Sequence, residues 1–256
     1  MTLAGNFFCT TIGRKVLVAV TGIVLILFVL AHLVGNLQIF EHPDKINGYS
    51  QFLRLLGPGL WIERTVLLAC AVIHIWATLK LALEEKAARG GQPYKRNRWL
   101  QATVASRYMR WTGLIVLAFA LYHLAQFTWG SVQTSTFKEN LPPYTMAADY
   151  HVFGFTAIRG GTRVLDVYSM VIRGFQNPLV AIFYIIAIGL LTLHLLHGAE
   201  SLFQTLGWRN ERWGKGLRRV VALCCALYFL GNLAIPGAVL TGHLSPLPPP
   251  AVAAVR

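Results

Sequence analysis

The stretch that decides the fold is Thr21–Leu37, which reads T-G-I-V-L-I-L-F-V-L-A-H-L-V-G-N-L. Its only ionisable side chain is His32, which has apolar residues on both sides. With its apolar neighbours, the stretch reaches the length of about 20 residues that a helix needs to cross the hydrocarbon layer of a membrane. An ionisable ring is costly at that depth, so it indicates a function. The stretch therefore predicts a membrane-spanning helix that carries a functional histidine.

The composition of the whole chain points the same way. Of its 256 residues, 55% are hydrophobic and 13% are charged, whereas about 25% of the residues in soluble domains are charged. The formal net charge is +13, but the basic residues flank apolar runs, so we expect them to orient a membrane protein and expect no nucleic-acid partner. The four cysteines form no C-x-x-C pair, so nothing indicates an iron–sulfur cluster, a zinc site or a covalently attached haem on this chain.

Five apolar segments are long enough to span a membrane. They cover residues 15–40, 64–83, 109–129, 178–206 and 220–240. Pro178 suits the start of a helix, whereas Pro236 is expected to kink or end the fifth one. We therefore expect an all-α membrane protein, with five helices packed as a bundle in a single membrane domain that covers residues 1–256. No internal repeat is evident.

The connections between the spans alternate in charge. Basic residues gather before the first span and in the second and fourth connections, whereas the first and third connections mix basic with acidic residues. The positive-inside rule then predicts a cytoplasmic N-terminus and a C-terminus outside. Residues 131–177 form a long outer connection, which we expect to cover the outer face. The proline-rich residues 241–256 are expected to form an unstructured tail.

Four histidines lie in four different spans: His32, His74, His123 and His197. Neutral imidazole is a common axial ligand of haem iron. The direction of each helix and a rise of about 1.5 Å per residue assign each ring a depth. His32 and His123 fall in the outer half of the membrane, and His74 and His197 fall nearer the inner side. This sorting predicts an outer haem held by the first pair and an inner haem held by the second pair.

The inner pair has an alternative. His194 lies three residues before His197, on the same face of the helix. Either ring can serve as the ligand, and the sequence favours His197 because Gly198 leaves room for a flat macrocycle. Each histidine taken alone could also be a hydrogen-bonded structural residue. The pairing by depth favours the haem interpretation for the four together.

Four stretches of the chain resemble the di-haem cytochrome b membrane anchor of succinate:menaquinone oxidoreductases and related fumarate reductases. They are T-T-I-G-R-K at Thr10–Lys15, the stretch Thr21–Leu37 quoted above, S-R-Y-M-R-W-T-G at Ser106–Gly113, and H-L-L-H-G-A-E-S-L-F-Q-T-L-G at His194–Gly207. The resemblance extends over all five spans and is weak across Ser131–Asp166 and in the tail. It implies two haem b groups, with His32, His74, His123 and His197 as the ligands of their iron.

The resemblance also implies a function. The chain would anchor succinate dehydrogenase in the bacterial cytoplasmic (inner) membrane, as a multi-pass protein that links the tricarboxylic acid cycle to the respiratory chain. It would carry electrons from an iron–sulfur subunit, through the two haems, to a membrane quinone, menaquinone by the resemblance. The implied partners are that subunit and a flavoprotein subunit, which hold the clusters and the flavin. No dicarboxylate catalysis is expected on this chain, and no catalytic residue is assigned to it.

Further polar residues are candidates for binding. The outer ones, at the level where a quinone carbonyl would need hydrogen bonds, are Asn36, Gln38, Glu41 and Gln126. The possible partners of haem propionates near the inner helix ends are Ser106, Arg107 and Ser201. The basic residues that could dock the soluble subunits are Arg96, Arg98, Arg107 and Arg110.

Two other functions remain open from the sequence. The chain could be the di-haem cytochrome b subunit of another quinone-linked dehydrogenase, such as a formate dehydrogenase or a hydrogenase, which has the same haem chemistry and a different electron donor. It could also be a haem-free transporter or structural anchor, in which the histidines line a polar cavity. The quoted stretches favour the succinate dehydrogenase family.

Overall fold

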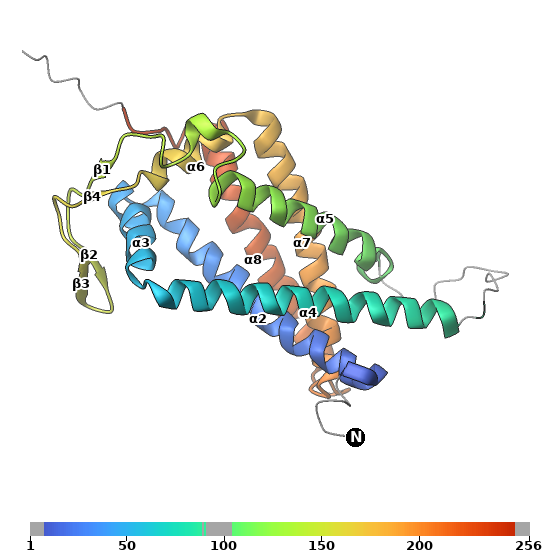
Figure 1. Ribbon diagram of the computed structural model, residues 1–256. Helices are drawn as coiled ribbons and strands as arrows, with labels where there is room; N and C mark the ends of the chain where they lie inside the picture. Colours follow the sequence, from blue (N-terminus) through green and yellow to red (C-terminus); the bar gives the residue numbers. More distant parts are fainter. Residues whose placement is uncertain (1–7, 89, 91–103, 249–256) are drawn as a thin grey trace, which may run out of the picture. The chain divides into compact units, whose positions relative to one another are not determined.

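The computed structural model describes residues 8–88, 90 and 104–248, and this part of the chain is mostly helical (Figure 1). Within it, five helices are long and apolar enough to cross a membrane. They are α2 (Thr11–Leu37), α4 (Pro58–Ala88), α5 (Val104–Phe127), α7 (Pro178–Thr205) and α8 (Gly214–Leu240). Each predicted span coincides with one of these helices. The expectation of five spans is thus confirmed, and the chain has the character of a multi-pass membrane protein.

The helix ends differ from the predicted ones where polar residues continue a helix. The second helix, α4, begins at Pro58 rather than at residue 64 and continues through charged residues to Ala88. Pro178 begins α7, as predicted. Pro236, in contrast, lies inside α8, which continues to Leu240, so the alternative that it ends the helix is wrong. Proline is tolerated within helices of membrane proteins, where neighbouring groups satisfy the freed carbonyl.

The contacts divide the chain into two compact units. Unit 1 comprises Met1–Ala31, Trp61–Gly113 and Leu191–Leu227, and unit 2 comprises His32–Leu60, Leu114–Leu190 and Tyr228–Arg256. Each long helix contributes one part to each unit. In the most apolar window of each long helix, only 6–22% of the residues are buried. Many large apolar side chains of these helices are exposed, as expected for helices whose solvent is lipid.

In unit 1, ion pairs join the helices near one set of their ends. They link Arg14 of α2 with Glu84 of α4, Arg110 of α5 with Glu85 of α4, and Arg218 of α8 with Glu200 of α7. The Arg14 side chain is almost fully buried. A buried guanidinium needs its partner, because an unpaired charge in a low-dielectric surrounding is costly. The pair with Glu84 therefore fixes α2 against α4.

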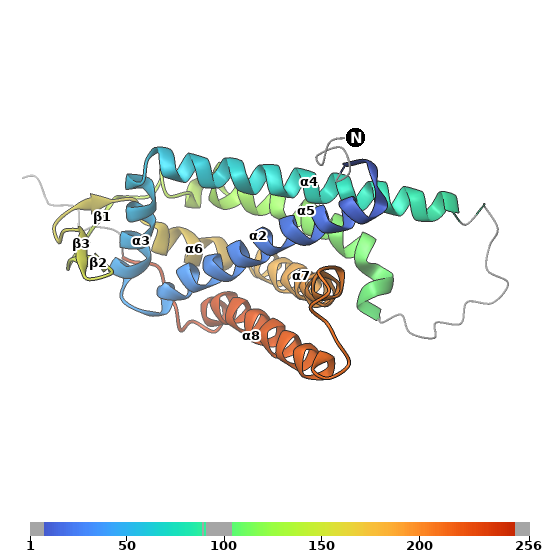
Figure 2. The ribbon, with the colours of Figure 1, turned by 90° about the horizontal axis from the view of Figure 1, so that it is seen from below.

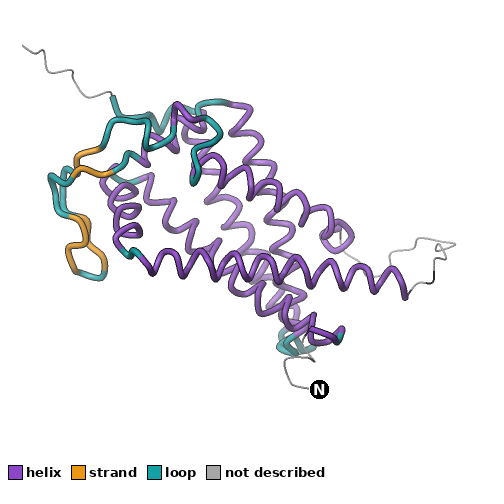
Figure 3. Tube along the Cα trace, in the orientation of Figure 1, coloured by secondary structure: helices purple, strands orange, loops and turns teal. Residues whose placement is uncertain are grey.

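In unit 2, the connections between the long helices are structured. Helix α3 (Pro43–Leu55) follows the short 3-10 helix η1 (Gln38–Phe40). Residues 131–177 contain η2 (Thr134–Thr136), the strands β1 (Tyr144–Thr145), β2 (Tyr150–Val152), β3 (Phe155–Ile158) and β4 (Arg163–Val164), and helix α6 (Val167–Phe175). Strand β1 pairs with β4, and β2 pairs with β3, both antiparallel. Figure 3 shows these strands in an otherwise helical chain. The expectation of an all-α fold therefore misses two small sheets.

The strands form because side chains of α3 pack against them. Figures 1 and 2 show, from two directions, that α3 lies beside the strands. Their buried residues form one cluster with partly buried side chains of α3, Tyr49 and Phe52. The buried members are Met146, Tyr150, Ile158 and Val164. Strands of two to four residues carry too short an alternation of apolar and polar residues to be read from sequence, and packing against α3 decides their conformation.

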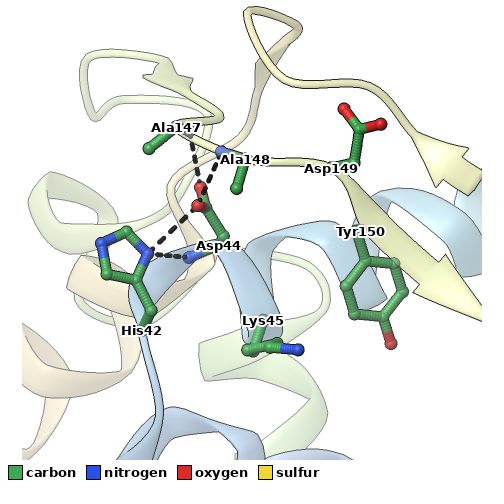
Figure 4. Close-up of a pocket in the computed structure, with 7 residues that line it drawn as sticks. All are labelled: His42, Asp44, Lys45, Ala147, Ala148, Asp149 and Tyr150. Atoms are coloured by element: carbon green, nitrogen blue, oxygen red, sulfur yellow. Dashed lines mark hydrogen bonds and ion pairs between the residues drawn. The ribbon is translucent and has the colours of Figure 1, made fainter.

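The first turn of α3 anchors this connection. The Asp44 carboxylate accepts hydrogen bonds from the backbone N–H groups of Ala147 (2.9 Å) and Ala148 (3.0 Å) and from the Tyr144 hydroxyl (2.8 Å). It also lies 3.1 Å from Nδ1 of His42. Figure 4 shows the carboxylate pointing at the two amides. Burial by itself would raise the pKa of Asp44, but these hydrogen bonds favour the ionised form and leave the pKa below its ordinary value.

The beginning of the predicted tail is not free of the rest of the chain. After α8, the backbone N–H of Leu247 donates a hydrogen bond to Oγ of Ser169 in α6, at 3.1 Å. Residues 241–248, at the start of the predicted tail, thus contact α6 within unit 2. Residues 249–256 lie outside the described part of the chain.

Candidate functional site

In unit 2, two of the predicted ligands lie side by side. The imidazole rings of His32 (α2) and His123 (α5) have centroids 5.7 Å apart, with an angle of 85° between their planes. Bonds between a metal ion and imidazole nitrogen are about 2 Å long, so two rings on opposite sides of one ion have centroids about 6 Å apart. The observed separation is close to that value. Two rings at this separation could hold one metal ion between them.

The second nitrogen of His123 faces a tyrosine. Nδ1 of His123 lies 3.4 Å from the hydroxyl of Tyr184 (α7), and that hydroxyl donates its proton to Oε1 of Gln126, at 2.8 Å. Since a hydroxyl has a single proton, the Tyr184 oxygen is left as the acceptor, and Nδ1 is the donor. Nε2 then carries a free lone pair. This is the tautomer in which a histidine binds metal through Nε2 and is oriented through Nδ1.

Aromatic rings surround the His123 imidazole. The ring centroids of Phe119, Phe127 and Tyr184 lie 6.1, 5.5 and 6.0 Å from that of His123. Phe175 of α6 packs on Tyr184, at 4.9 Å. These contacts fix the positions of Tyr184 and of the His123 ring. They also make the surroundings of His123 apolar, apart from the tyrosine hydroxyl.

In unit 1, the His74 ring of α4 has a similar polar contact. Its Nδ1 lies 3.1 Å from Oγ1 of Thr21 in α2. The Thr21 hydroxyl donates its proton to the backbone carbonyl of Leu17, at 2.7 Å. The threonine oxygen is therefore an acceptor for His74, and the backbone carbonyl of Val18 also accepts a hydrogen bond from this ring.

The same contact occurs a second time in unit 1, and it involves His194 rather than His197. Nδ1 of His194 (α7) lies 3.2 Å from Oγ1 of Thr112 (α5), whose hydroxyl donates to the backbone carbonyl of Met109 at 3.1 Å. His74 and His197 are both within electrostatic range of the His194 ring. His194 thus has the same kind of contact as His74, with a threonine hydroxyl at Nδ1. Within the long helices, His74, His123 and His194 have Nδ1 directed at a hydroxyl on another helix. His151 and His243, outside these helices, also have Nδ1 at a hydroxyl, but that hydroxyl belongs to a residue close by in the sequence.

These contacts follow a residue spacing that occurs twice in the sequence. Thr21-Gly22 stands eleven positions before His32, and Thr112-Gly113 stands eleven positions before His123. Likewise, His74 and His194 each lie sixteen positions after the proline that begins their helix. The repeated pattern T-G-x9-H has few invariant letters, and the connections between the two copies differ in length. It therefore becomes evident only once the side chains that it brings together are known.

The four quinone candidates have different surroundings. Gln126 is buried and bonded to Tyr184 and Gln133. Oε1 of Gln38 lies 3.3 Å from the Tyr150 hydroxyl, which donates to it. Glu41 is exposed and lies 3.8 Å from Lys45, and Asn36 is half-buried in α2. Gln126 is the candidate whose hydrogen bonds lead to a histidine, whereas Gln38 and Glu41 bond to the connection and to α3.

The structure gives fewer contacts for the candidates near the inner helix ends, which were predicted to bind haem propionates or to dock the soluble subunits. Arg107 and Ser201 are exposed, and Arg110 is paired with Glu85. The side chain of Ser106 lies outside the described part of the chain, as do Arg96 and Arg98. Their assignment to haem propionates or to a docking surface stays a prediction.

Among the described residues, no group of three or more histidine, cysteine, aspartate or glutamate side chains could hold a metal ion. In unit 2, the His32 and His123 rings instead meet as a pair. This suits a metal whose other ligands come from a macrocycle, as in haem. No protein-family model, curated protein or solved structure matches the chain. The functional argument therefore depends on the chain's own residues.

Proposed function

We propose that this chain is the di-haem cytochrome b membrane anchor of a succinate dehydrogenase. In this role it carries electrons from an iron–sulfur subunit to a membrane quinone. Two haem b groups, when bound, supply the one-electron redox chemistry. The residues of the chain bind these groups, orient their ligands and exclude water from them.

One observation carries the proposal: histidines in membrane-spanning helices are gathered in two places, one in each unit. In unit 2, the His32 and His123 rings have the separation of two axial ligands. In unit 1, His74 and His194 have matching threonine partners. An isolated structural histidine needs hydrogen bonds at both nitrogens, whereas a ligand needs one bond at Nδ1 and a free Nε2. The three hydroxyl contacts support the second arrangement.

For the unit 1 haem we assign His74 and His194 as the ligands. The sequence favoured His197, and His194 was its alternative. The contact with Thr112 supports His194, because metal-bound histidines are regularly oriented through their second nitrogen. The same contact at His74 makes the two ligands equivalent.

The proposal retains the topology expected from the sequence. The N-terminus lies in the cytoplasm, the C-terminus lies outside, and the basic connections face the cytoplasm of a bacterial cell. The flavoprotein and iron–sulfur subunits then dock on the cytoplasmic side. The His32–His123 haem is the outer one, and a quinone such as menaquinone binds near it. The side chains that we propose for hydrogen bonds to the quinone are Asn36, Gln38, Glu41 and Gln126.

A visible spectrum of the purified complex tests the proposal. We would isolate the chain in detergent with its copurifying subunits, count haems by the pyridine haemochrome method, and compare reduction by dithionite with reduction by succinate. We expect two b-type haems per chain, at least one of which succinate reduces.

Each other outcome supports one of the alternative functions. Two haems that formate or hydrogen reduces, and succinate does not, identify another quinone-linked dehydrogenase. A colourless chain that stays folded in detergent refutes the cytochrome proposal and favours a haem-free transporter or anchor.

A further inference from the structure

In unit 1, two Thr-Gly dipeptides each lie against one imidazole ring. The hydroxyl of Thr21 contacts Nδ1 of His74 at 3.1 Å, and a Cβ added to Gly22 would lie 3.6 Å from Cε1 of the same ring. In the second copy, Thr112 contacts Nδ1 of His194 at 3.2 Å, and a Cβ on Gly113 would lie 3.4 Å from Cε1. Each ring thus lies beside both residues of its dipeptide, and an added Cβ would be at ordinary van der Waals distance from it.

Both threonines are almost fully buried, with 5% of Thr21 and 4% of Thr112 exposed. A threonine in a helix commonly bonds only to a carbonyl of the preceding turn. Thr21 and Thr112 make that bond and a second contact to a ring on another helix. The carbonyl bond matters for the second contact, because it takes the hydroxyl proton and turns the oxygen lone pairs towards the imidazole.

We propose that Thr21 and Thr112 are matched positioning residues of the unit 1 haem. Each accepts the Nδ1 proton of one axial ligand, which sets the tautomer and the rotation of the ring. Each also makes the ligand a stronger electron donor to iron, as acceptors at the second nitrogen do. Since each of the two ligands of this haem has a threonine acceptor, both threonines influence the reduction potential of the same haem. This inference rests on the proposed function, because it requires that His74 and His194 bind haem.

The test uses the whole complex and the substitutions Thr21→Val, Thr112→Val and the double variant. Valine keeps the size and the β-branch and removes the acceptor. The readout is a redox titration followed in the visible spectrum, which resolves the two haems. We expect the potential of the unit 1 haem to rise in each single variant and to rise further in the double variant. The affinity of that site for haem should fall on the order of 10-fold. The unit 2 haem should keep its potential and thereby report on folding.

Two further variants isolate the hydroxyl. Thr→Ser at either position keeps the acceptor and should restore the potential. Thr78→Val is the matched control, because the Thr78 hydroxyl bonds to backbone carbonyls of α4, including that of His74, at 2.9 Å. It should leave both potentials unchanged.

The outcomes separate this inference from the function on which it rests. A wild-type complex without haem refutes the proposed function. A wild-type complex with two haems whose potentials do not respond to either valine variant refutes the role of the threonines and leaves the cytochrome intact. Loss of both haems in the valine and serine variants alike also refutes it, because the missing acceptor would then not be the cause.

Discussion

The histidines of unit 1 and unit 2 occupy different surroundings. In unit 1, His74 and His194 each contact a threonine hydroxyl. In unit 2, His123 lies among phenylalanine rings and meets the Tyr184 hydroxyl at a longer distance, 3.4 Å. Hydrogen bonds weaken with distance, so the His74 and His194 rings are held more firmly at Nδ1 than the His123 ring is.

The two sites nevertheless come from the same repeated pattern. In each T-G-x9-H copy, the Thr-Gly end serves the site in unit 1, and the histidine end serves the site in unit 2. Each copy therefore contributes to both sites, and each site takes one part from each copy. A short repeat can thus build two paired sites, and their different potentials would be set by the residues outside the repeat.

The largest expected effect concerns the choice of ligand in unit 1. His194→Ala should remove one haem and leave the haem of unit 2, because the iron loses an axial ligand. His197→Ala is the matched control on the same helix and should keep both haems. The pyridine haemochrome count and the resolved redox titration measure this. The reverse result, with one haem lost only in His197→Ala, would show that the contact with Thr112 does not mark the ligand.

In unit 2, His32→Ala and His123→Ala should remove the same haem, since the two rings face each other at 5.7 Å. The haem left in both variants should have the potential of the unit 1 haem. His151→Ala provides the control, because His151 is exposed on β2. If the two variants lose haems of different potential, the pairing of histidines within units is incorrect.

A smaller effect is expected from Asp44, whose contacts lie in unit 2 alone. Asp44→Ala leaves the amides of Ala147 and Ala148 and the Tyr144 hydroxyl without their acceptor, at a cost of about 2 kcal/mol. Hydrogen exchange at those amides should accelerate, and only the unit 2 haem should respond. Asp149→Ala, which removes one acceptor from Gly160, should have less effect. Equal exchange rates in the two variants would contradict the role of Asp44.

The pKa of Asp44 also gives this contact a pH dependence. Because the folded state lowers the pKa below 3.8, its contribution is fully present above that value. It is lost only as the pH falls through the lowered pKa. Exchange of the Ala147 and Ala148 amides, after correction for the intrinsic pH dependence, should therefore stay constant at mildly acidic pH and accelerate in stronger acid.

The smallest effect is expected from Tyr184→Phe, which removes the hydroxyl and keeps the ring packing. The potential of the unit 2 haem should rise, by less than that of the unit 1 haem in Thr21→Val, because the contact with His123 is longer. Tyr122→Phe is the control, since Tyr122 packs on Phe183 and Tyr184. A shift in unit 2 as large as that caused by Thr21→Val would contradict the ranking of the two sites.

The sequence was informative about the long helices and less so about what lies between them. Hydropathy located all five spans because about 20 apolar residues have few other uses. It missed α3, α6 and the strands around Tyr150, because short amphipathic elements acquire their conformation from the surfaces that cover them. The same limit explains Pro236, whose effect on α8 depends on neighbouring helices.

The sequence by itself determined that the chain has five membrane-spanning helices and that histidines stand in four of them, because length and polarity in a membrane are properties of single segments. The tertiary structure decided which side chains meet. Thr21 and His74 are 53 positions apart, and Thr112 and His194 are 82 positions apart. Neither contact follows from spacing along one helix. His194 and His197 share a helix face, so only the packing of α5 against α7 brings Thr112 to one of them.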